Sequence, residues 1–158
     1  MDNHSEQEPC NFFCMAFIGE YSHSIDQKKR LAIPAKFRKG LGREAVITRG
    51  LDGCLWLYPL KEWEVLARKL GKLPIGQWQA RGFARAMLAG AAEVELDRLG
   101  RILIPEYLKS YAGLEKQVVV TGLYNRIEIW DEVRWCEYKA NTEKEVEKMA
   151  GELGSFGV

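Results

Sequence analysis

Hydrophobic and polar positions occur in the same order twice along this chain. In residues 25–38 a polar loop separates two short apolar runs, and an Ile-Pro step ends the second run; residues 96–109 repeat this arrangement without a gap. The matched residues are Asp26 and Asp97, Arg30 and Arg101, Ile33-Pro34 and Ile104-Pro105, and Arg38 and Lys109. Repetition at a fixed offset indicates an internal duplication.

The repetition continues downstream with one residue gained. Residues 46–51 match residues 118–123, and Trp63 matches Trp135. The chain is therefore expected to fold as two related units.

Each unit is expected to combine short strands with a short helix. Pro34 cannot donate to a strand ladder and suits the first turn of a helix, which Gly40 is expected to stop. Two β-rich runs around a glycine-containing turn predict a hairpin. The elements expected in the first unit are a strand at 17–24, a loop at 26–29, a strand at 31–33, a helix at 34–39, and hairpin strands at 45–48 and 54–58.

The second unit is expected to rebuild the first. Asp131 is a good N-cap for the helix that ends it. Its expected elements are a strand at 92–96, a loop at 97–100, a strand at 101–104, a helix after Pro105, hairpin strands at 117–121 and 126–130, and a helix at about 132–149.

Two helices are predicted between the units. Residues 59–70 place Leu60, Trp63 and Leu70 on one stripe, and residues 77–88 form the second helix. In this interpretation the two helices are an insertion that has no equivalent in the second unit. The helices are assigned either to contacts between subunits or to packing within the chain.

These expectations divide the chain into five parts. They are a disordered N-terminal tail (1–14), a first repeat (17–64), a helical inter-repeat segment (65–90), a second repeat (91–135), and a C-terminal helix and tail (136–158). Translation can also start at Met15.

Charge is balanced overall but not along the chain. Lysine and arginine together number 23, against 22 for aspartate and glutamate. Between residues 27 and 49, however, basic residues stand almost alone: Lys28, Lys29, Arg30, Lys36, Arg38, Lys39, Arg43 and Arg49 against Glu44. A local basic field indicates a footprint for a polyanion.

Catalytic and metal-binding patterns are missing from the sequence. His4 and His23 are the only histidines, there is no GxxxxGK loop, and the four cysteines fit no repeated zinc spacing, so we expect no enzyme, cofactor or metal. Cys10 and Cys14 near His4 are interpreted as incidental. No apolar run approaches the roughly 20 residues that span a bilayer. We expect a cytoplasmic protein that binds neither a membrane nor a small-molecule substrate.

The repeated Asp-to-Arg spacing has two chemical interpretations. The arginine fork can pair with the aspartate and fix the loop, or it can bind a phosphate or a guanine edge in a bidentate way. Both interpretations stay open, and repetition beside Lys28, Lys29 and Arg98 favours an outward-facing role.

The stretch from Asp26 to Arg38 resembles the D-x-K-G-R-x-x-(I/V)-P-x-(K/R)-(F/Y)-R signature of the MraZ family. The second copy and the stretches at 57–63 and 125–130 are similar too, so the resemblance covers about residues 15–139. It implies an α+β fold of two tandem SpoVT-AbrB-type β-rich units that form one pseudo-two-fold module, with inter-repeat helices and a C-terminal helix.

The resemblance also implies a function. MraZ proteins are bacterial transcription regulators, mainly repressors of the division and cell-wall operon. They bind short direct repeats in double-stranded DNA as ring-shaped homo-oligomers and associate with the nucleoid. No cofactor or catalysis comes with the family.

Carried onto this chain, the family's DNA-contacting arginine falls on Arg30, with Lys28 and Lys29 beside it and Arg101 as its counterpart. Lys36 and Arg38 are further candidate phosphate contacts, although Lys36 can equally solvate its helix. The chain departs from the signature at Lys29, where glycine is usual. If the loop needs a positive φ there, lysine carries a strain of about 1 kcal/mol or more.

A second hypothesis is an oligomeric protein-interaction module, or an antitoxin-like unit of the same superfamily, that caps a partner through its C-terminal helix. Trp130, Trp135 and Tyr138 lie in a row that can form such a contact surface. The alternative for this row is a place in the core.

Overall fold

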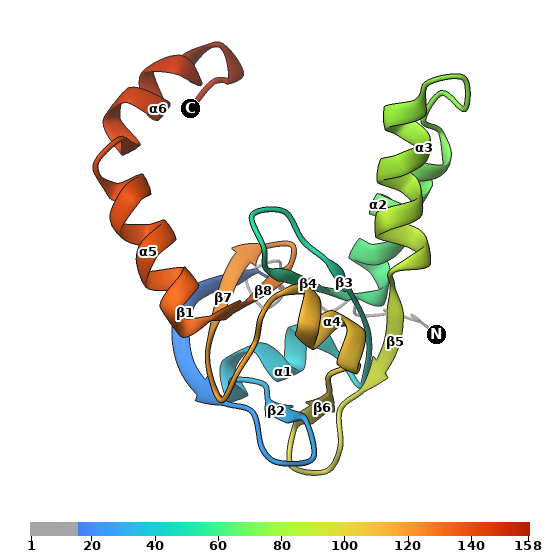
Figure 1. The fold of residues 1–158 in the computed structure, drawn as a ribbon, viewed down its shortest axis with the longest axis vertical. Coiled ribbons are helices and arrows are strands. Elements are labelled where there is room, and N and C mark those ends of the chain that lie inside the picture. Colours follow the sequence, from blue (N-terminus) through green and yellow to red (C-terminus); the bar gives the residue numbers. More distant parts are fainter. Residues whose placement is uncertain (1–15) are drawn as a thin grey trace, which may run out of the picture.

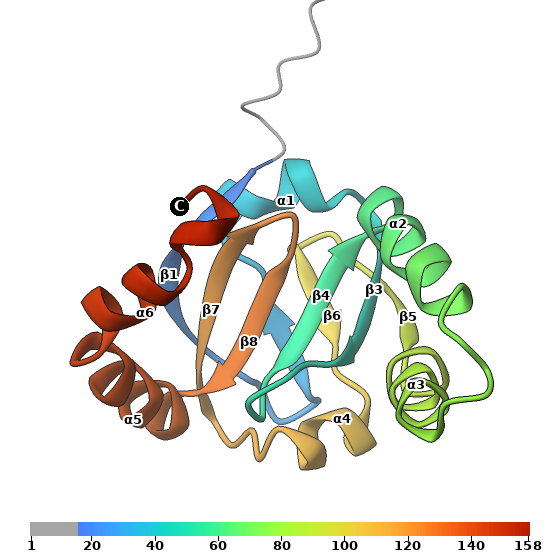
Figure 2. The same ribbon diagram turned by 90° about the horizontal axis from the view of Figure 1, so that it is seen from above.

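The computed structural model describes residues 16–158. The predicted tail at 1–14, together with His4, Cys10 and Cys14, lies outside this part. Figures 1 and 2 show a small β-rich body with two helical arms that project from its opposite sides.

The body is built on a six-stranded antiparallel sheet and a separate two-stranded ribbon. The sheet has the order β1-β7-β8-β4-β3-β5, and the ribbon pairs β2 with β6. The strands are β1 (Phe17–Ser24), β2 (Arg30–Ala32), β3 (Glu44–Arg49), β4 (Leu55–Pro59), β5 (Ala92–Glu95), β6 (Arg101–Leu103), β7 (Gln117–Tyr124) and β8 (Ile127–Asp131).

Helices flank the ribbon and form the two arms. Short helices start directly after Pro34 and Pro105, as predicted. The helices are α1 (Ala35–Leu41), α2 (Leu60–Gly71), α3 (Trp78–Ala84), the π-helix η2 (Arg85–Ala89), α4 (Glu106–Tyr111), α5 (Glu132–Glu143), α6 (Val146–Glu152) and the 3-10 helix η3 (Gly154–Phe156).

The two units exchange strands across a pseudo-two-fold axis. β1 of the first unit pairs with β7 of the second, and β5 of the second pairs with β3 of the first. Counterparts in the duplication meet on the axis, where Trp56 lies opposite Glu128 and Leu31 lies opposite Ile102. The predicted α+β class, with two tandem β-rich units in one pseudo-two-fold module, is confirmed.

The core lies between the sheet and the inner face of the ribbon. Leu31 and Ile102 on the ribbon and Leu57 and Ile127 on the sheet are fully buried. Since burial of an aliphatic side chain stabilises by about 1.5–3 kcal/mol, this layer fixes the ribbon to the body. The other face of the ribbon is left for solvent.

Three expectations about helices are corrected by the structure. The first short helix continues through Gly40 to Leu41 and is capped by Gly42, whose positive φ of 77° suits glycine. The C-terminal helix is broken, with α5 ending at Glu143 and α6 beginning at Val146. The segment after the first hairpin is no unmatched insertion either, because α5 follows β8 as α2 follows β4.

Candidate nucleic-acid interface

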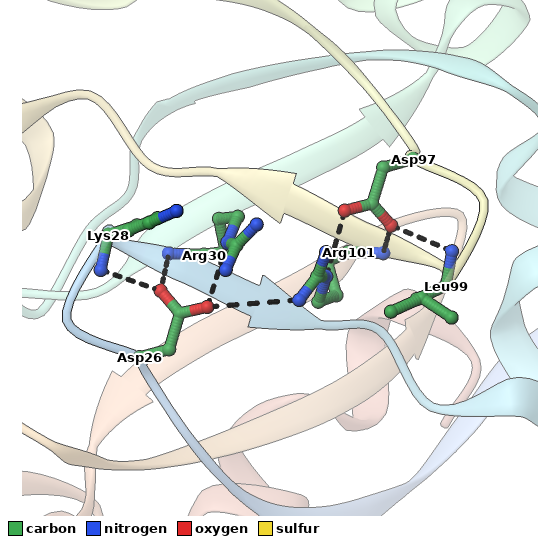
Figure 3. A network of polar contacts seen from close by, with 6 residues as sticks. All are labelled: Asp26, Lys28, Arg30, Asp97, Leu99 and Arg101. Atoms are coloured by element: carbon green, nitrogen blue, oxygen red, sulfur yellow. Dashed lines mark hydrogen bonds and ion pairs between the residues drawn. The ribbon is translucent and has the colours of Figure 1, made fainter.

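The candidate interface is the solvent-facing side of the β2–β6 ribbon. Side chains alternate between the faces of a strand, and directly opposed residues share a face. Arg30 lies opposite Leu103 and Ala32 opposite Arg101, so these four residues share one side while Leu31 and Ile102 are buried on the other. The two arginines therefore lie side by side on the outer face (Figure 3).

Each arginine is held by the aspartate four residues before it. Arg30 Nε donates to Asp26 Oδ2 at 2.8 Å, and Arg101 Nε donates to Asp97 Oδ2 at the same distance. Arg101 Nη1 also lies 4.0 Å from Asp26 Oδ2, which links the two halves. Within residues 16–158, no side-chain hydrogen bond engages the terminal nitrogens of Arg30, so its outer donors stay free for a ligand.

The loop backbone fixes the aspartates in turn. Asp26 Oδ1 accepts from the backbone N–H groups of Lys28 and Arg30, both at 2.9 Å. Asp97 Oδ1 accepts in the same way from Leu99 at 2.9 Å and Arg101 at 3.0 Å. Each aspartate thus closes its own loop and orients its arginine.

These contacts keep the carboxylates charged. The backbone N–H of Arg30, followed by its side chain, lowers the pKa of Asp26 below its ordinary value of 3.8. Arg101 lowers the pKa of Asp97 through the same contacts. Hydrogen bonds to the charged form favour that form. The first interpretation of the Asp-to-Arg spacing, in which the pair fixes the loop, is therefore observed. The second, binding of a phosphate or a guanine edge, stays a prediction, and 32% of the Arg30 side chain and 25% of the Arg101 side chain are exposed for it.

Lys28 and Lys29 differ sharply although they are neighbours. Lys28 is exposed at the loop tip. Lys29 has a φ of 62°, close to the 72° of its counterpart Gly100, so the positive φ expected here is present. Its ammonium pairs with Glu106 of the second unit at 2.5 Å. Lys29 is therefore partly neutralised.

The candidates on the first short helix also differ. Lys36 is exposed on α1. Arg38 Nε instead donates to the Ile33 carbonyl at 2.8 Å, and a Cβ at Gly100 would lie 2.2 Å from that nitrogen. Arg38 is thus used to join α1, β2 and the second loop.

Three residues at this surface were not predicted from the sequence as parts of the site. Leu99 and Leu103 are 63% and 59% exposed; they lie two residues before and two residues after Arg101, and Leu103 is directly opposite Arg30. Glu106 supplies the partner of Lys29. The offset of the duplication was a usable signal for the leucines, because it aligns Leu99 with Lys28 and Leu103 with Ala32.

A second feature is a hollow of about 640 Å³ at the base of α5. Trp135 and Tyr138 line it together with the hairpin residues Leu51 and Trp56. Trp130, in contrast, is 3% exposed. The aromatic row is therefore divided: Trp130 belongs to the core, and Tyr138 is exposed at its outer end.

Neither a metal-binding cluster nor a membrane-spanning helix is present in the described residues. No cluster of three or more histidine, cysteine or acidic residues in 16–158 is placed to hold a metal ion. No helix in that range has the length and apolar character needed to cross a bilayer.

Strand exchange between two copies of one unit, with paired arginines on the ribbon that the copies share, defines an α+β protein of two tandem, intertwined β-rich units. A family model described as "MraZ protein, putative antitoxin-like" matches residues 16–86 and again residues 87–153.

Curated relatives agree with this match. A protein of Natranaerobius thermophilus is 48% identical over 142 residues, which are 90% of this chain and 99% of the relative. A relative from Clostridium beijerinckii is 49% identical over the same shares, and one from Pelotomaculum thermopropionicum is 50% identical over 87% of this chain and 94% of its own. All three are named "Transcriptional regulator MraZ". The chain belongs to the MraZ family of transcriptional regulators, which is not an enzyme class.

Proposed function

We propose that this protein is a sequence-specific DNA-binding regulator, mainly a repressor, of the division and cell-wall operon, and that it binds short direct repeats as a ring-shaped homo-oligomer at the nucleoid in the cytoplasm. The observation that carries the proposal is the pair Arg30 and Arg101 on the outer face of the ribbon.

The shape of the ribbon suits the major groove of DNA. That groove admits a two-stranded β-ribbon, and arginine binds the O6 and N7 atoms of guanine in a bidentate way. Buried Leu31 and Ile102 hold the ribbon rigidly on the body, so the arginines are presented without a large ordering cost. Each arginine can therefore read one guanine.

Phosphate contacts come from the surrounding lysines. Lys28 and Lys36 are exposed near the ribbon and can neutralise phosphates, while Lys29 and Arg38 are largely used within the protein. Such contacts release counterions, so affinity falls as salt rises. We assign Lys28 and Lys36 to phosphate binding, and Lys29 and Arg38 chiefly to positioning the ribbon.

The arms supply the surfaces for a ring. Exposed apolar side chains are found on the α2–α3 arm (Ile75 and Trp78) and on the α6–η3 end (Leu153 and Phe156). The α2–α3 arm is rich in basic residues, among them Lys69, Lys72, Arg81 and Arg85. The C-terminal arm, from the end of α5 through η3, is rich in acidic residues, among them Glu143, Glu145, Glu147 and Glu152. Two different complementary surfaces make a head-to-tail contact, which closes into a ring if the rotation allows.

Binding to DNA upstream of the protein's own gene tests the proposal. Fluorescence anisotropy over a salt series compares this duplex with a scrambled duplex of equal length, and light scattering reports the oligomer. We expect preferential binding that persists near physiological salt, because linked sites bind with avidity. Weak, sequence-blind binding that disappears near physiological salt would contradict it.

A second candidate is a protein-interaction or antitoxin-like module at the hollow beside α5. The exposed end of the aromatic row, Tyr138, favours it because aromatic anchors in pockets dominate protein interfaces. Pull-down with a toxin-like protein encoded next to this gene separates the two candidates. Capture that Tyr138→Ala abolishes supports the module, and an unaltered capture contradicts it.

A further inference from the structure

We propose that the two halves of the ribbon recognise different bases, and that Leu99 and Leu103 contact thymine methyl groups beside the base recognised by Arg101. This inference rests on the proposed DNA binding. It concerns the sequence of the site and its orientation, neither of which follows from the paired arginines alone.

The duplication preserves the arginines but changes their neighbours. Lys28 at the tip of the first loop corresponds to Leu99 at the tip of the second. Ala32 on the outer face of β2 corresponds to Leu103 on the outer face of β6. Along its own strand and loop, Arg30 is therefore flanked by a charge and a small side chain, and Arg101 by two large apolar side chains, of which Leu103 also lies directly opposite Arg30.

The backbone holds both leucines in defined positions. The N–H of Leu99 donates to Asp97 Oδ1 at 2.9 Å, which fixes the loop tip next to Arg101, as Figure 3 shows. Leu103 lies directly opposite Arg30 in the ribbon register. Within the described chain, nothing covers the larger part of either side chain, since 63% of Leu99 and 59% of Leu103 is exposed.

Exposure of one leucine is ordinary, but two leucines around an arginine on a rigid, basic surface form a small apolar patch. In the major groove, the only apolar group on a base edge is the C5-methyl of thymine. A guanine bound by Arg101 with thymine next to it fits this patch. The first half offers Lys28 instead, which suits a phosphate.

The consequence is a site with a direction. If both halves presented the same chemistry, the pseudo-two-fold axis would favour a palindromic site. Different halves bind an asymmetric sequence in one orientation. Successive subunits in the same orientation along the duplex then require direct repeats.

The test replaces thymine by deoxyuridine, which removes only the methyl group, at one position at a time in the bound upstream duplex. Loss of one buried methyl is worth about 0.8 kcal/mol, or roughly a fourfold loss of affinity. We expect such a loss at one or two thymines for the wild-type protein. The variant Leu99→Ala/Leu103→Ala should bind the two duplexes equally well.

Ile18→Ala is the matched control, because Ile18 is also 63% exposed but lies on β1. It should keep the wild-type response to deoxyuridine. Light scattering on every variant separates a base contact from a contact between subunits.

Two failures are distinguishable. If specific binding is present but no thymine responds, or the leucine variant responds like wild type, this inference is overturned while the proposed function stands. Absence of specific binding to any upstream duplex overturns the proposed function itself. A smaller oligomer for the leucine variant, with its deoxyuridine response unchanged, assigns the leucines to a subunit contact and also overturns the inference.

Discussion

Gly100 and Lys29 occupy the same place in the two loops and share a positive φ, but their surroundings differ. Both have positive φ values, 72° and 62°. Gly100 lies under the Arg38 side chain, whereas Lys29 extends to Glu106. An exposed ion pair contributes only about 0–1 kcal/mol, so it offsets at most part of the strain at Lys29.

Gly100→Ala should therefore destabilise the protein more than Lys29→Ala does. The new Cβ would lie 2.2 Å from Arg38 Nε and would displace a guanidinium that binds the Ile33 carbonyl. We expect a loss of about 1–3 kcal/mol in the free energy of unfolding, measured by urea titration. In an Arg38→Ala background the loss should be smaller, because only the backbone strain remains. An equal loss in both backgrounds would show that the contact with Arg38 is unimportant.

Local spacing carried most of the information about the candidate site. Asp26 and Arg30 are close in sequence, so their pairing and its repetition at Asp97 and Arg101 could be anticipated. The Lys29 to Glu106 pair could not, because the two residues are far apart in sequence and meet only because β2 pairs with β6. Whether these arginines bind DNA stays a prediction.

At the scale of elements, each half of the ribbon depends on an aspartate that closes its loop. The lowered pKa of Asp26, caused first by the backbone N–H of Arg30, means that the folded state binds its proton less readily than the unfolded chain does. The associated stability is present above the ordinary value of 3.8. It is lost as the pH falls from there through the lowered folded value.

The variant Asp26→Asn/Asp97→Asn should remove this pH dependence. Urea midpoints measured from pH 6 to pH 2.5 should fall steeply below about pH 4 for the wild type and less steeply for the variant. At neutral pH the variant should be the less stable of the two, because the amide is a weaker acceptor than the carboxylate. Parallel acid limbs would mean that other carboxylates dominate acid unfolding.

Elements of strong local character were predictable from the sequence. Proline placed the starts of α1 and α4, and β-rich runs around a turn gave the β3–β4 hairpin. The pairing of β1 with β7 was not predictable, because strand partners depend on contacts between distant segments. The break between α5 and α6 was also not predicted. Most residues of these two helices are exposed, so their sequence shows little periodic alternation of apolar and polar positions that could locate the break.

At the scale of the whole molecule, the arms and the ribbon lie at different ends. In Figure 1 both arms extend away from the ribbon, on opposite sides of the body. Contacts between neighbouring subunits through the arms would leave every ribbon accessible. We therefore expect mutations to separate the proposed assembly from the proposed DNA binding.

Trp78→Glu should reduce the oligomer without unfolding the protein. Trp78 is 72% exposed on α3, so its replacement removes apolar contact area from the arm surface and adds a charge that an acidic neighbouring arm repels. Light scattering should give a lower mass with an unchanged circular dichroism spectrum. Ile18→Glu, on the exposed side of β1, is the control and should keep the wild-type mass. A wild-type mass for Trp78→Glu would place the subunit contacts elsewhere.

The affinity of Arg30→Ala, Arg101→Ala and Arg68→Ala for the upstream duplex, at fixed, near-physiological salt, tests whether the ribbon arginines bind specific DNA. Arg68 is an exposed arginine on α2, paired with Glu64, and serves as the matched control. Each ribbon variant should lose about 1–3 kcal/mol of specific binding, with the oligomer intact, while Arg68→Ala binds as wild type does. Wild-type affinity for both ribbon variants would contradict the account.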